Sequence, residues 1–129
     1  MKQLLALALA AALLACSKSI TTTGSSGIAG TWKRTETLMD PGDGSGQWAA
    51  VPAAERSTVS FGADGSIRSS SHWYLARFQQ YRLLSDSQLR VYSGAGDSAT
   101  LGYGFDKGKL RLDLQCIEAC KDAFVRVGD

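Results

Sequence analysis

The side chains best suited to covalent chemistry are the thiols of Cys16, Cys116 and Cys120 and the imidazole of His72. His72 follows three serines, but a serine nucleophile also needs an orienting acid and oxyanion donors that the fold brings near it. Cys116 and Cys120 do not have the Cys-x-x-Cys spacing of redox or zinc sites. We therefore expect a protein that is not an enzyme and holds no metal or cofactor, with an enzyme based on His72 as the alternative.

Cys16 ends an apolar segment at the start of the chain. Residues 4–15 are all leucine or alanine and follow Lys2. Because about 20 apolar residues are needed to cross a bilayer, this shorter segment is typical of a signal peptide. Leu13-Leu14-Ala15-Cys16 resembles the lipobox of bacterial lipoproteins. That resemblance implies cleavage before Cys16, diacylation of its thiol and acylation of the new amino group; an ordinary signal peptide is the alternative.

The rest of the chain divides into a tether and one domain. Residues 17–27 are Ser, Thr, Gly and Lys apart from Ile20, a composition that cannot form a core. We therefore expect a signal peptide at 1–15, an acylated cysteine and flexible tether at 16–27, and a single domain at 28–129. The acyl chains would anchor this domain to a lipid bilayer in a bacterial cell envelope. Ser17 favours the outer membrane, with the domain facing the periplasm.

Charge bears on the possible partners. The formal net charge is only +2, which argues against nucleic acid. Arg68, Arg82, Arg90 and Arg111 are expected to form a solvated basic outer face, with contact to anionic head groups or an acidic partner as the alternative. We expect a monomer.

Short runs with apolar side chains at every second position predict β-strands throughout the domain. No segment has the apolar stripe of a helix, although residues 52–56 are compatible with one turn, and 39–51 is expected to be a loop. The eight predicted strands are residues 28–38, 57–61, 66–70, 77–84, 88–93, 100–105, 109–116 and 123–127.

The same alternation gives each predicted strand one apolar face. In the run 109–116, this face contains Leu110, Leu112, Leu114 and Cys116. Eight such strands joined mostly by short turns favour an all-β, antiparallel up-and-down barrel, because closure removes the exposed edges of a sheet. A barrel of this size holds either packed side chains or one small ligand.

The sequence Gly30-Thr31-Trp32 in the first predicted strand, together with Arg126 in the last, resembles the lipocalin and fatty-acid-binding-protein superfamily. The strand pattern over 28–127 and the segments 40–46 and 116–120 are similar to small lipocalin-like lipoproteins of bacteria. The resemblance implies that Trp32 plugs one end of the barrel beneath Arg126. The long helix before the last strand of larger lipocalins is missing, which argues against a spacious ligand cup.

Cys116 and Cys120 are expected to form a disulfide. Two thiols remain once Cys16 carries lipid, and the envelope is kept oxidising. Four residues of extended strand span about 13 Å, whereas bridged α-carbons lie roughly 4.4–6.8 Å apart. The chain between the two cysteines must therefore bend.

Several side chains are candidates for ligand binding at the mouth or in the lumen of the barrel. Aromatic rings in the predicted loops and neighbouring strands are suited to an apolar or amphipathic molecule, with core packing as the alternative. Arg34 and Glu36 share the face of Trp32, so they point inward as a pair unless a β-bulge intervenes. The aromatic candidates are Trp48, Trp73, Tyr74, Phe78 and Tyr103.

The sequence favours a lipid-anchored barrel that binds a small hydrophobic or amphipathic ligand. The alternative is an interaction protein that inserts its 39–51 loop into an enzyme cleft, resembling envelope β-barrel inhibitors of lysozyme. Asp40 and Asp43 in this loop are typical of calcium ligands, but the order of residues is not that of a calcium loop. We expect an Asp-capped turn there.

Overall fold

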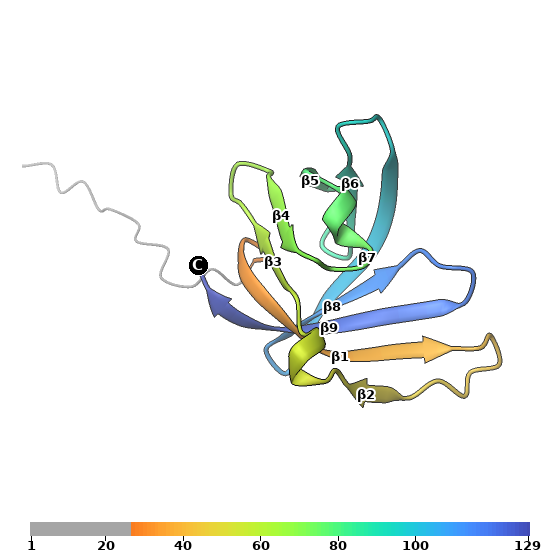
Figure 1. Ribbon diagram of the computed structural model, residues 1–129. Helices are drawn as coiled ribbons and strands as arrows, with labels where there is room; N and C mark the ends of the chain where they lie inside the picture. The colour runs from red at the N-terminus through yellow and green to blue at the C-terminus, as the bar shows by residue number, and fades with distance from the viewer. Residues whose placement is uncertain (1–26) are drawn as a thin grey trace, which may run out of the picture.

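The computed structural model describes residues 27–129, which form an antiparallel β-barrel (Figure 1). The predicted signal peptide, Cys16 and most of the predicted tether lie outside the described residues. No helix within 27–129 is long and apolar enough to cross a bilayer. The strands are β1 (Gly30–Asp40), β2 (Trp48–Ala50), β3 (Thr58–Phe61), β4 (Ile67–Ser70), β5 (Gln80–Leu83), β6 (Gln88–Tyr92), β7 (Ser98–Asp106), β8 (Lys109–Leu114) and β9 (Ala119–Gly128), with short 3-10 helices η1 (Ala53–Glu55) and η2 (Leu75–Arg77).

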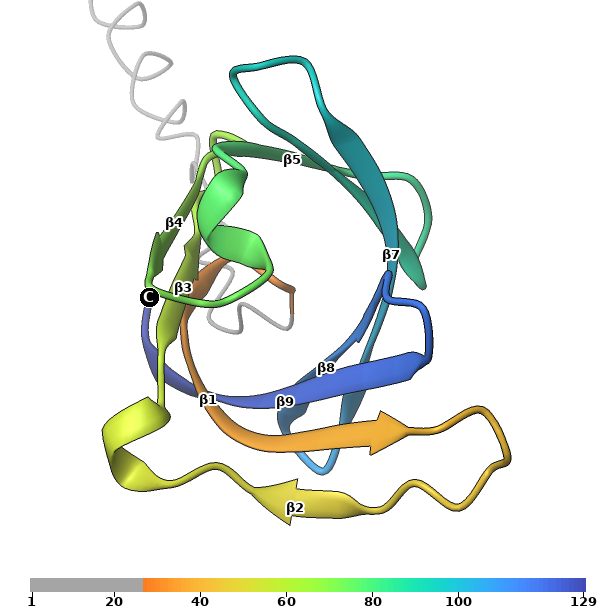
Figure 2. The same cartoon turned by 45° about the vertical axis from the view of Figure 1, so that its right-hand side comes forward.

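The strand order confirms the predicted eight-stranded antiparallel barrel. Neighbouring strands follow β4-β3-β1-β9-β8-β7-β6-β5, with the short β2 attached to β1 outside this path. Contacts between β4 and β5 bring the two ends of the sheet together: Ser66 bridges Gln80, and Ile67 N–H donates to the carbonyl of Gln79 at 2.8 Å. We call this junction the seam. Figure 2 shows the resulting ring of strands.

The strand pattern departs from the predicted one most in three places. The expected 39–51 loop contains β2, which pairs Trp48 with Leu38 and turns the segment into a hairpin. β9 begins at Ala119 rather than at residue 123, because it pairs along β1 as far as Asp40. β5 begins at Gln80 rather than at residue 77, because the preceding residues form η2. Tertiary pairing extends β1 and β9 beyond the runs in which apolar residues alternate.

Side chains fill the interior of the barrel. The inward residues of β6 and β8 and Leu101 of β7 are buried, as their alternation predicts. Further along the same face, Tyr103 is only half-buried and Phe105 is 44% exposed, and Cys116 lies beyond the end of β8 and is exposed. The segment between β4 and β5 passes over one end of the ring (Figure 2). Its apolar side chains belong to the buried core. Tyr74, Leu75 and Phe78 are at most 5% exposed. The lumen is therefore a packed core.

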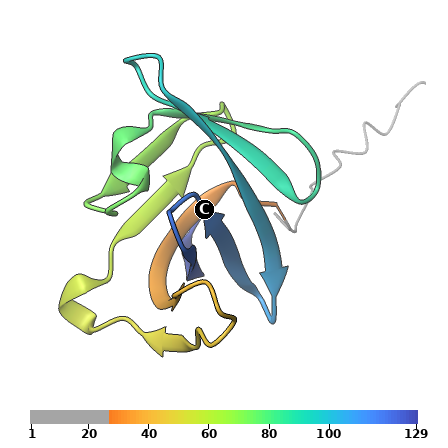
Figure 3. The same cartoon turned by 90° about the vertical axis from the view of Figure 1, so that its right-hand side faces the viewer.

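The two ends of the barrel differ. The described part of the chain begins at one end, where the C-terminus and the β3–β4, β5–β6 and β7–β8 turns also lie; we call this the terminal end (Figures 1 and 3). The β1–β2 hairpin and the turn between β8 and β9 lie at the other end, which we call the hairpin end.

Trp32 and Arg126 close the terminal end. Trp32 is 2% exposed and donates its indole N–H to the carbonyl of Ile28 at 2.8 Å. The guanidinium carbon of Arg126 lies 4.3 Å from the centre of the Trp32 ring, and the guanidinium donates to the carbonyl of Ala29 at 2.8 Å. Gly30 has φ +137°, and a β-carbon there would collide with this guanidinium. Trp32 is thus buried beneath Arg126 at this end of the barrel.

Cys116 and Cys120 are joined across the turn between β8 and β9, with α-carbons 6.3 Å apart. Cys120 is buried, whereas Cys116 is exposed. Between them lies Ile117, which is fully exposed. The predicted bend is present, and the bridge constrains a turn at the hairpin end.

Candidate functional site

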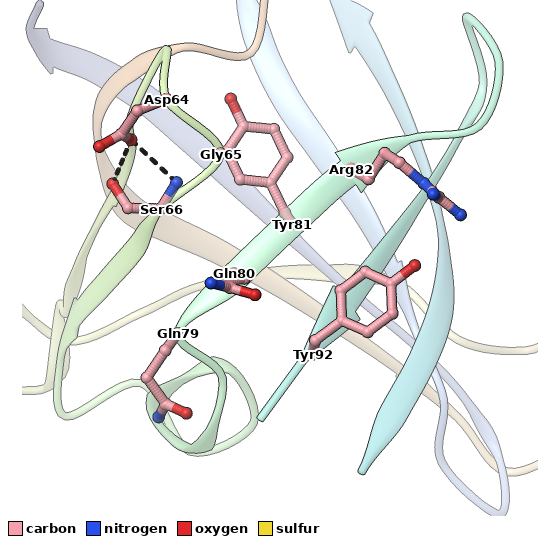
Figure 4. Close-up of a pocket in the computed structure, with 8 residues that line it drawn as sticks. All are labelled: Asp64, Gly65, Ser66, Gln79, Gln80, Tyr81, Arg82 and Tyr92. Atoms are coloured by element: carbon pink, nitrogen blue, oxygen red, sulfur yellow. Dashed lines mark hydrogen bonds between the residues drawn. The ribbon is translucent and has the colours of Figure 1, made fainter. Parts of the chain in front are cut away.

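A pocket of about 510 Å³ opens at the seam between β4 and β5. Both strands are only four residues long, so few backbone contacts join them, and polar side chains surround the gap (Figure 4). We call it the seam pocket. Its lining residues are Asp64, Gly65, Ser66, Gln79, Gln80, Tyr81, Arg82 and Tyr92.

The β3–β4 turn forms one wall of the seam pocket. Asp64 Oδ1 accepts hydrogen bonds from the hydroxyl of Ser66 at 2.6 Å and from its backbone N–H at 3.0 Å. These bonds hold the pKa of Asp64 below its usual value. Gly65 has φ +87°, and a β-carbon there would approach the carbonyl of Tyr81 to 3.2 Å. The turn thus presents a charged carboxylate to the pocket and lets β5 approach closely.

β5 forms the opposite wall, and its side chains alternate between core and solvent. Tyr81 packs edge-on against Phe61, with ring centres 5.1 Å apart, and donates its hydroxyl to the carbonyl of Gly62 at 2.8 Å. Burial raises the pKa of Tyr81, and the charge of Asp64 adds to the rise. Gln80 and Arg82 take the alternate positions and are exposed.

β6 extends this wall. Gln80 pairs with Tyr92, and Arg82 pairs with Arg90, so the two arginines are direct neighbours on the outer face. Arg90 has its guanidinium carbon 6.0 Å from the centre of the Tyr92 ring and donates to the hydroxyl of Ser98 at 3.1 Å. The seam pocket therefore has an acidic wall at the turn and a basic residue, Arg82, on the β5 wall, with Arg90 next to Arg82 on β6 but outside the lining.

A β-bulge separates the two charged candidates of β1. The register of β1 against β9 shifts between Arg34 and Glu36. Arg34 points inward, where its Nε lies 3.0 Å from Oδ1 of Asp122. Glu36 points outward and accepts a bond from Lys109 Nζ at 2.7 Å. The sequence predicted either an inward Arg34–Glu36 pair or a β-bulge. The bulge is present, so Glu36 does not face the lumen.

The aromatic candidates do not form a single mouth. Tyr74 packs at a tilt against Phe78 in the core, with ring centres 5.8 Å apart. Trp73 is 56% exposed at the hairpin end, and Tyr103 is half-buried and donates its hydroxyl to the carbonyl of Ser85 at 3.0 Å. Trp48 lies on the outer face of β2, with its ring 4.8 Å from the guanidinium carbon of Arg111. Trp48 is therefore held by strand pairing, away from the packed lumen.

A buried polar cluster surrounds Asp122, which is 1% exposed. Its Oδ2 accepts hydrogen bonds from His72 Nε2 at 2.9 Å and from the indole N–H of Trp73 at 3.3 Å, while Oδ1 forms the ion pair with Arg34. Burial acts to raise the pKa of Asp122, but hydrogen bonds from His72 and Thr37 and the charge of Arg34 outweigh it and lower the pKa. We call these four residues, Arg34, His72, Trp73 and Asp122, the Asp122 cluster.

Hydrogen bonds to both ring nitrogens hold His72 in place within the Asp122 cluster. His72 Nδ1 accepts backbone N–H bonds from Tyr74 at 3.2 Å and from Leu75 at 3.1 Å, and its Nε2 bonds Asp122. Both ring nitrogens are thus occupied, and neither is placed to take a proton from a serine. Within residues 27–129 no group of three or more His, Cys, Asp or Glu side chains is placed to hold a metal ion.

The Asp40 turn at the tip of the β1–β2 hairpin is held by its own backbone. Asp40 Oδ1 accepts the N–H groups of Gly42 at 2.8 Å and Gly44 at 3.0 Å, and Oδ2 accepts that of Gly46 at 3.0 Å. These three bonds lower the pKa of Asp40. The loop is the Asp-capped turn that the sequence predicts.

Sequence reasoning missed both the seam pocket and Asp122. Asp122 lies two residues from Cys120 and from Phe124, which are both buried. A strand predicted from residue 119 would therefore have placed the side chain of Asp122 on the same inward face. The seam joins strands that carry no special motif, and only closure of the barrel brings them together. Comparison of the chain with protein-family models, curated proteins and solved structures gives no match.

Proposed function

We propose that this protein is a lipid-anchored component of a bacterial cell envelope that binds a small amphipathic molecule in its seam pocket. The observation that supports this proposal is the contrast between a lumen filled by core side chains and an open pocket of about 510 Å³ on the barrel wall. Tyr92 offers apolar ring surface there, and the neighbouring side chains offer hydrogen-bonding groups. Such a mixture suits an amphipathic ligand.

The terminal end of the barrel supports the anchoring. From Cys16 to Gly27 the chain has 12 residues, which reach at most about 43 Å when extended. The terminal end would therefore stay near the bilayer, and the hairpin end would face away. Exposed apolar side chains near the turns and the C-terminus at this end suit a position near lipid. They are Leu83, Leu84, Phe105 and Val127, all at least 44% exposed.

Extraction tests ligand binding. Protein purified from envelopes in mild detergent is expected to carry a small molecule that organic extraction and mass spectrometry detect. Tyr92→Ala should reduce its yield at least about tenfold, because a buried aromatic contact is worth up to a few kcal/mol. Trp48→Ala, which removes an aromatic ring outside the pocket, should leave the yield unchanged. Empty extracts from the wild type, or equal yields from Tyr92→Ala, would contradict the proposal.

Substitution of Cys16 tests the anchor. Cys16→Ala should move nearly all of the protein from the membrane fraction to the soluble fraction, because two or more acyl chains hold a protein stably at a bilayer whereas an unacylated tether does not. Immunoblots of fractionated cells measure the change. Ser17→Ala is the matched control and should stay with the membrane. A membrane-bound Cys16→Ala protein would remove the anchoring from the proposal.

A second candidate function is an interaction protein that inserts the β1–β2 hairpin into an enzyme cleft. Two observations favour it: the Asp40 turn fixes the tip of the hairpin, and the hairpin end exposes Met39 (68%) and Ile117 (106%). A rigid loop with exposed apolar side chains suits a partner's cleft, since little freedom is lost on binding. The extraction experiment separates the two candidates, because a hairpin inhibitor needs no small molecule.

A further inference from the structure

We propose that the seam pocket selects anionic sugars, meaning hydroxyl-rich molecules that carry a carboxylate or a phosphate. This inference rests on the proposed binding function of the pocket and names the class of its ligand. It starts from the pairing of Arg82 with Arg90, two guanidinium groups on directly opposed positions of β5 and β6.

Like charges on opposed positions of an antiparallel pair are destabilising. None of the ion pairs within residues 27–129 includes Arg82, Arg90 or the nearby Arg68. No carboxylate within residues 27–129 therefore forms an ion pair with Arg82 or Arg90, whereas the charge of Arg68 acts on Asp64. An anion between Arg82 and Arg90 would relieve the repulsion, and the planar guanidinium fork matches a carboxylate or a phosphate.

The size and lining of the pocket argue for a ligand larger than a bare anion. A volume of about 510 Å³ lies within the range of small-molecule sites, roughly 300–1,000 Å³. The amide of Gln80, the hydroxyl of Ser66 and the phenol of Tyr92 offer both donors and acceptors to the same space (Figure 4). Such groups suit a molecule with several hydroxyls.

Asp64 sets the orientation of this ligand. Its carboxylate lies at the turn, across the pocket from β5 (Figure 4), and its Oδ1 is already engaged by Ser66. A negative group placed next to Asp64 would be repelled, whereas a sugar hydroxyl can donate to Oδ2. The anionic group therefore points to Arg82 and Arg90, and the hydroxyls point to the turn.

Calorimetric titration of the full-length protein in mild detergent tests the inference. The probes are glucuronate, glucose 6-phosphate and the neutral methyl glucoside. Each charged sugar is expected to bind at least about tenfold more tightly than methyl glucoside, and Arg82→Gln or Arg90→Gln should weaken the charged sugars at least about tenfold, the scale of one charge-assisted hydrogen bond. The tighter of the two charged probes identifies the preferred anionic group.

The matched control is Lys33→Gln, which removes an exposed positive charge from β1 and should not change the affinity. Arg82, Arg90 and Lys33 are exposed and Tyr92 is half-buried, and thermal unfolding of each variant checks its fold. Equal affinity for neutral and charged sugars, with both affinities lowered by Tyr92→Ala, would contradict the preference for anionic sugars but would still support ligand binding in the seam pocket. Absence of binding by all three probes would overturn the sugar class, while a ligand recovered by extraction would still support the pocket.

Discussion

Replacement of Asp122 by alanine is expected to lower the free energy of unfolding by about 3–5 kcal/mol, the range for breaking a buried charge pair. The variant would leave the guanidinium of Arg34 without its counterion and His72 Nε2 without its acceptor. Urea denaturation followed by far-ultraviolet circular dichroism measures the loss. Asp113→Ala is the matched control, because this carboxylate pairs with Lys121 at the exposed surface, and its loss should cost at most about 1 kcal/mol.

The same carboxylate makes stability depend on pH. The pKa of Asp122 is lower in the folded protein than its ordinary value, so its contribution is fully present above the unfolded pKa of about 4 and is lost as the pH falls through the folded pKa. The difference in stability between the wild type and Asp122→Asn should therefore be constant near neutral pH and shrink below about pH 4. A difference that stays constant down to pH 2 would mean that Asp122 does not carry this linkage.

Replacement of Trp32 by alanine is expected to cost about 3–5 kcal/mol, the range for removing a buried large aromatic side chain. Trp32 is 2% exposed, and its removal would also leave Arg126 without the ring beneath it, a contact worth about 0.5–2 kcal/mol. Trp32→Phe should cost less, because it keeps a ring and loses mainly the indole bond to Ile28. The measurement is again urea denaturation by circular dichroism.

Trp48 provides the control for this plug. It is half-buried on the outer face of the sheet, so Trp48→Ala should cost about 1 kcal/mol. Equal losses for Trp32→Ala and Trp48→Ala would contradict a closing role for Trp32. Because Trp32 lies at the terminal end, its loss should also loosen the chain start near Gly27, where Arg126 donates to the backbone at 2.8 Å.

The directions of the side chains along β1 show what could and could not be predicted from the sequence. Alternation places Arg34 and Glu36 on one face, and the cost of burying two charges requires either a pair or a bulge. The alternation cannot choose between them, because the choice depends on Asp122 of β9, which is distant in sequence and neutralises Arg34 from the inside. With Arg34 satisfied, a bulge releases Glu36 to the surface and to Lys109.

The aromatic residues show the complementary limit. The sequence identifies Trp48, Tyr74 and Phe78 as large aromatic residues. Such residues can pack in a core or contact a ligand, and the sequence alone does not distinguish the two. Burial of Tyr74 and Phe78 follows from the path of the chain between β4 and β5 over the barrel end. The position of Trp48 follows from β2, whose three residues carry too short a pattern to be recognised without their partner strand.

By itself the sequence determined the class of fold, the number of barrel strands, most inward faces and the bent cysteine turn. These properties follow from local alternation, turn residues and the short separation of two thiols, all of which act between near neighbours. Only the tertiary structure decided that the lumen is filled, that Asp122 holds Arg34 and His72 together, and that a pocket opens at the seam. Those features depend on which distant strands meet when the sheet closes, and closure is a property of the whole barrel.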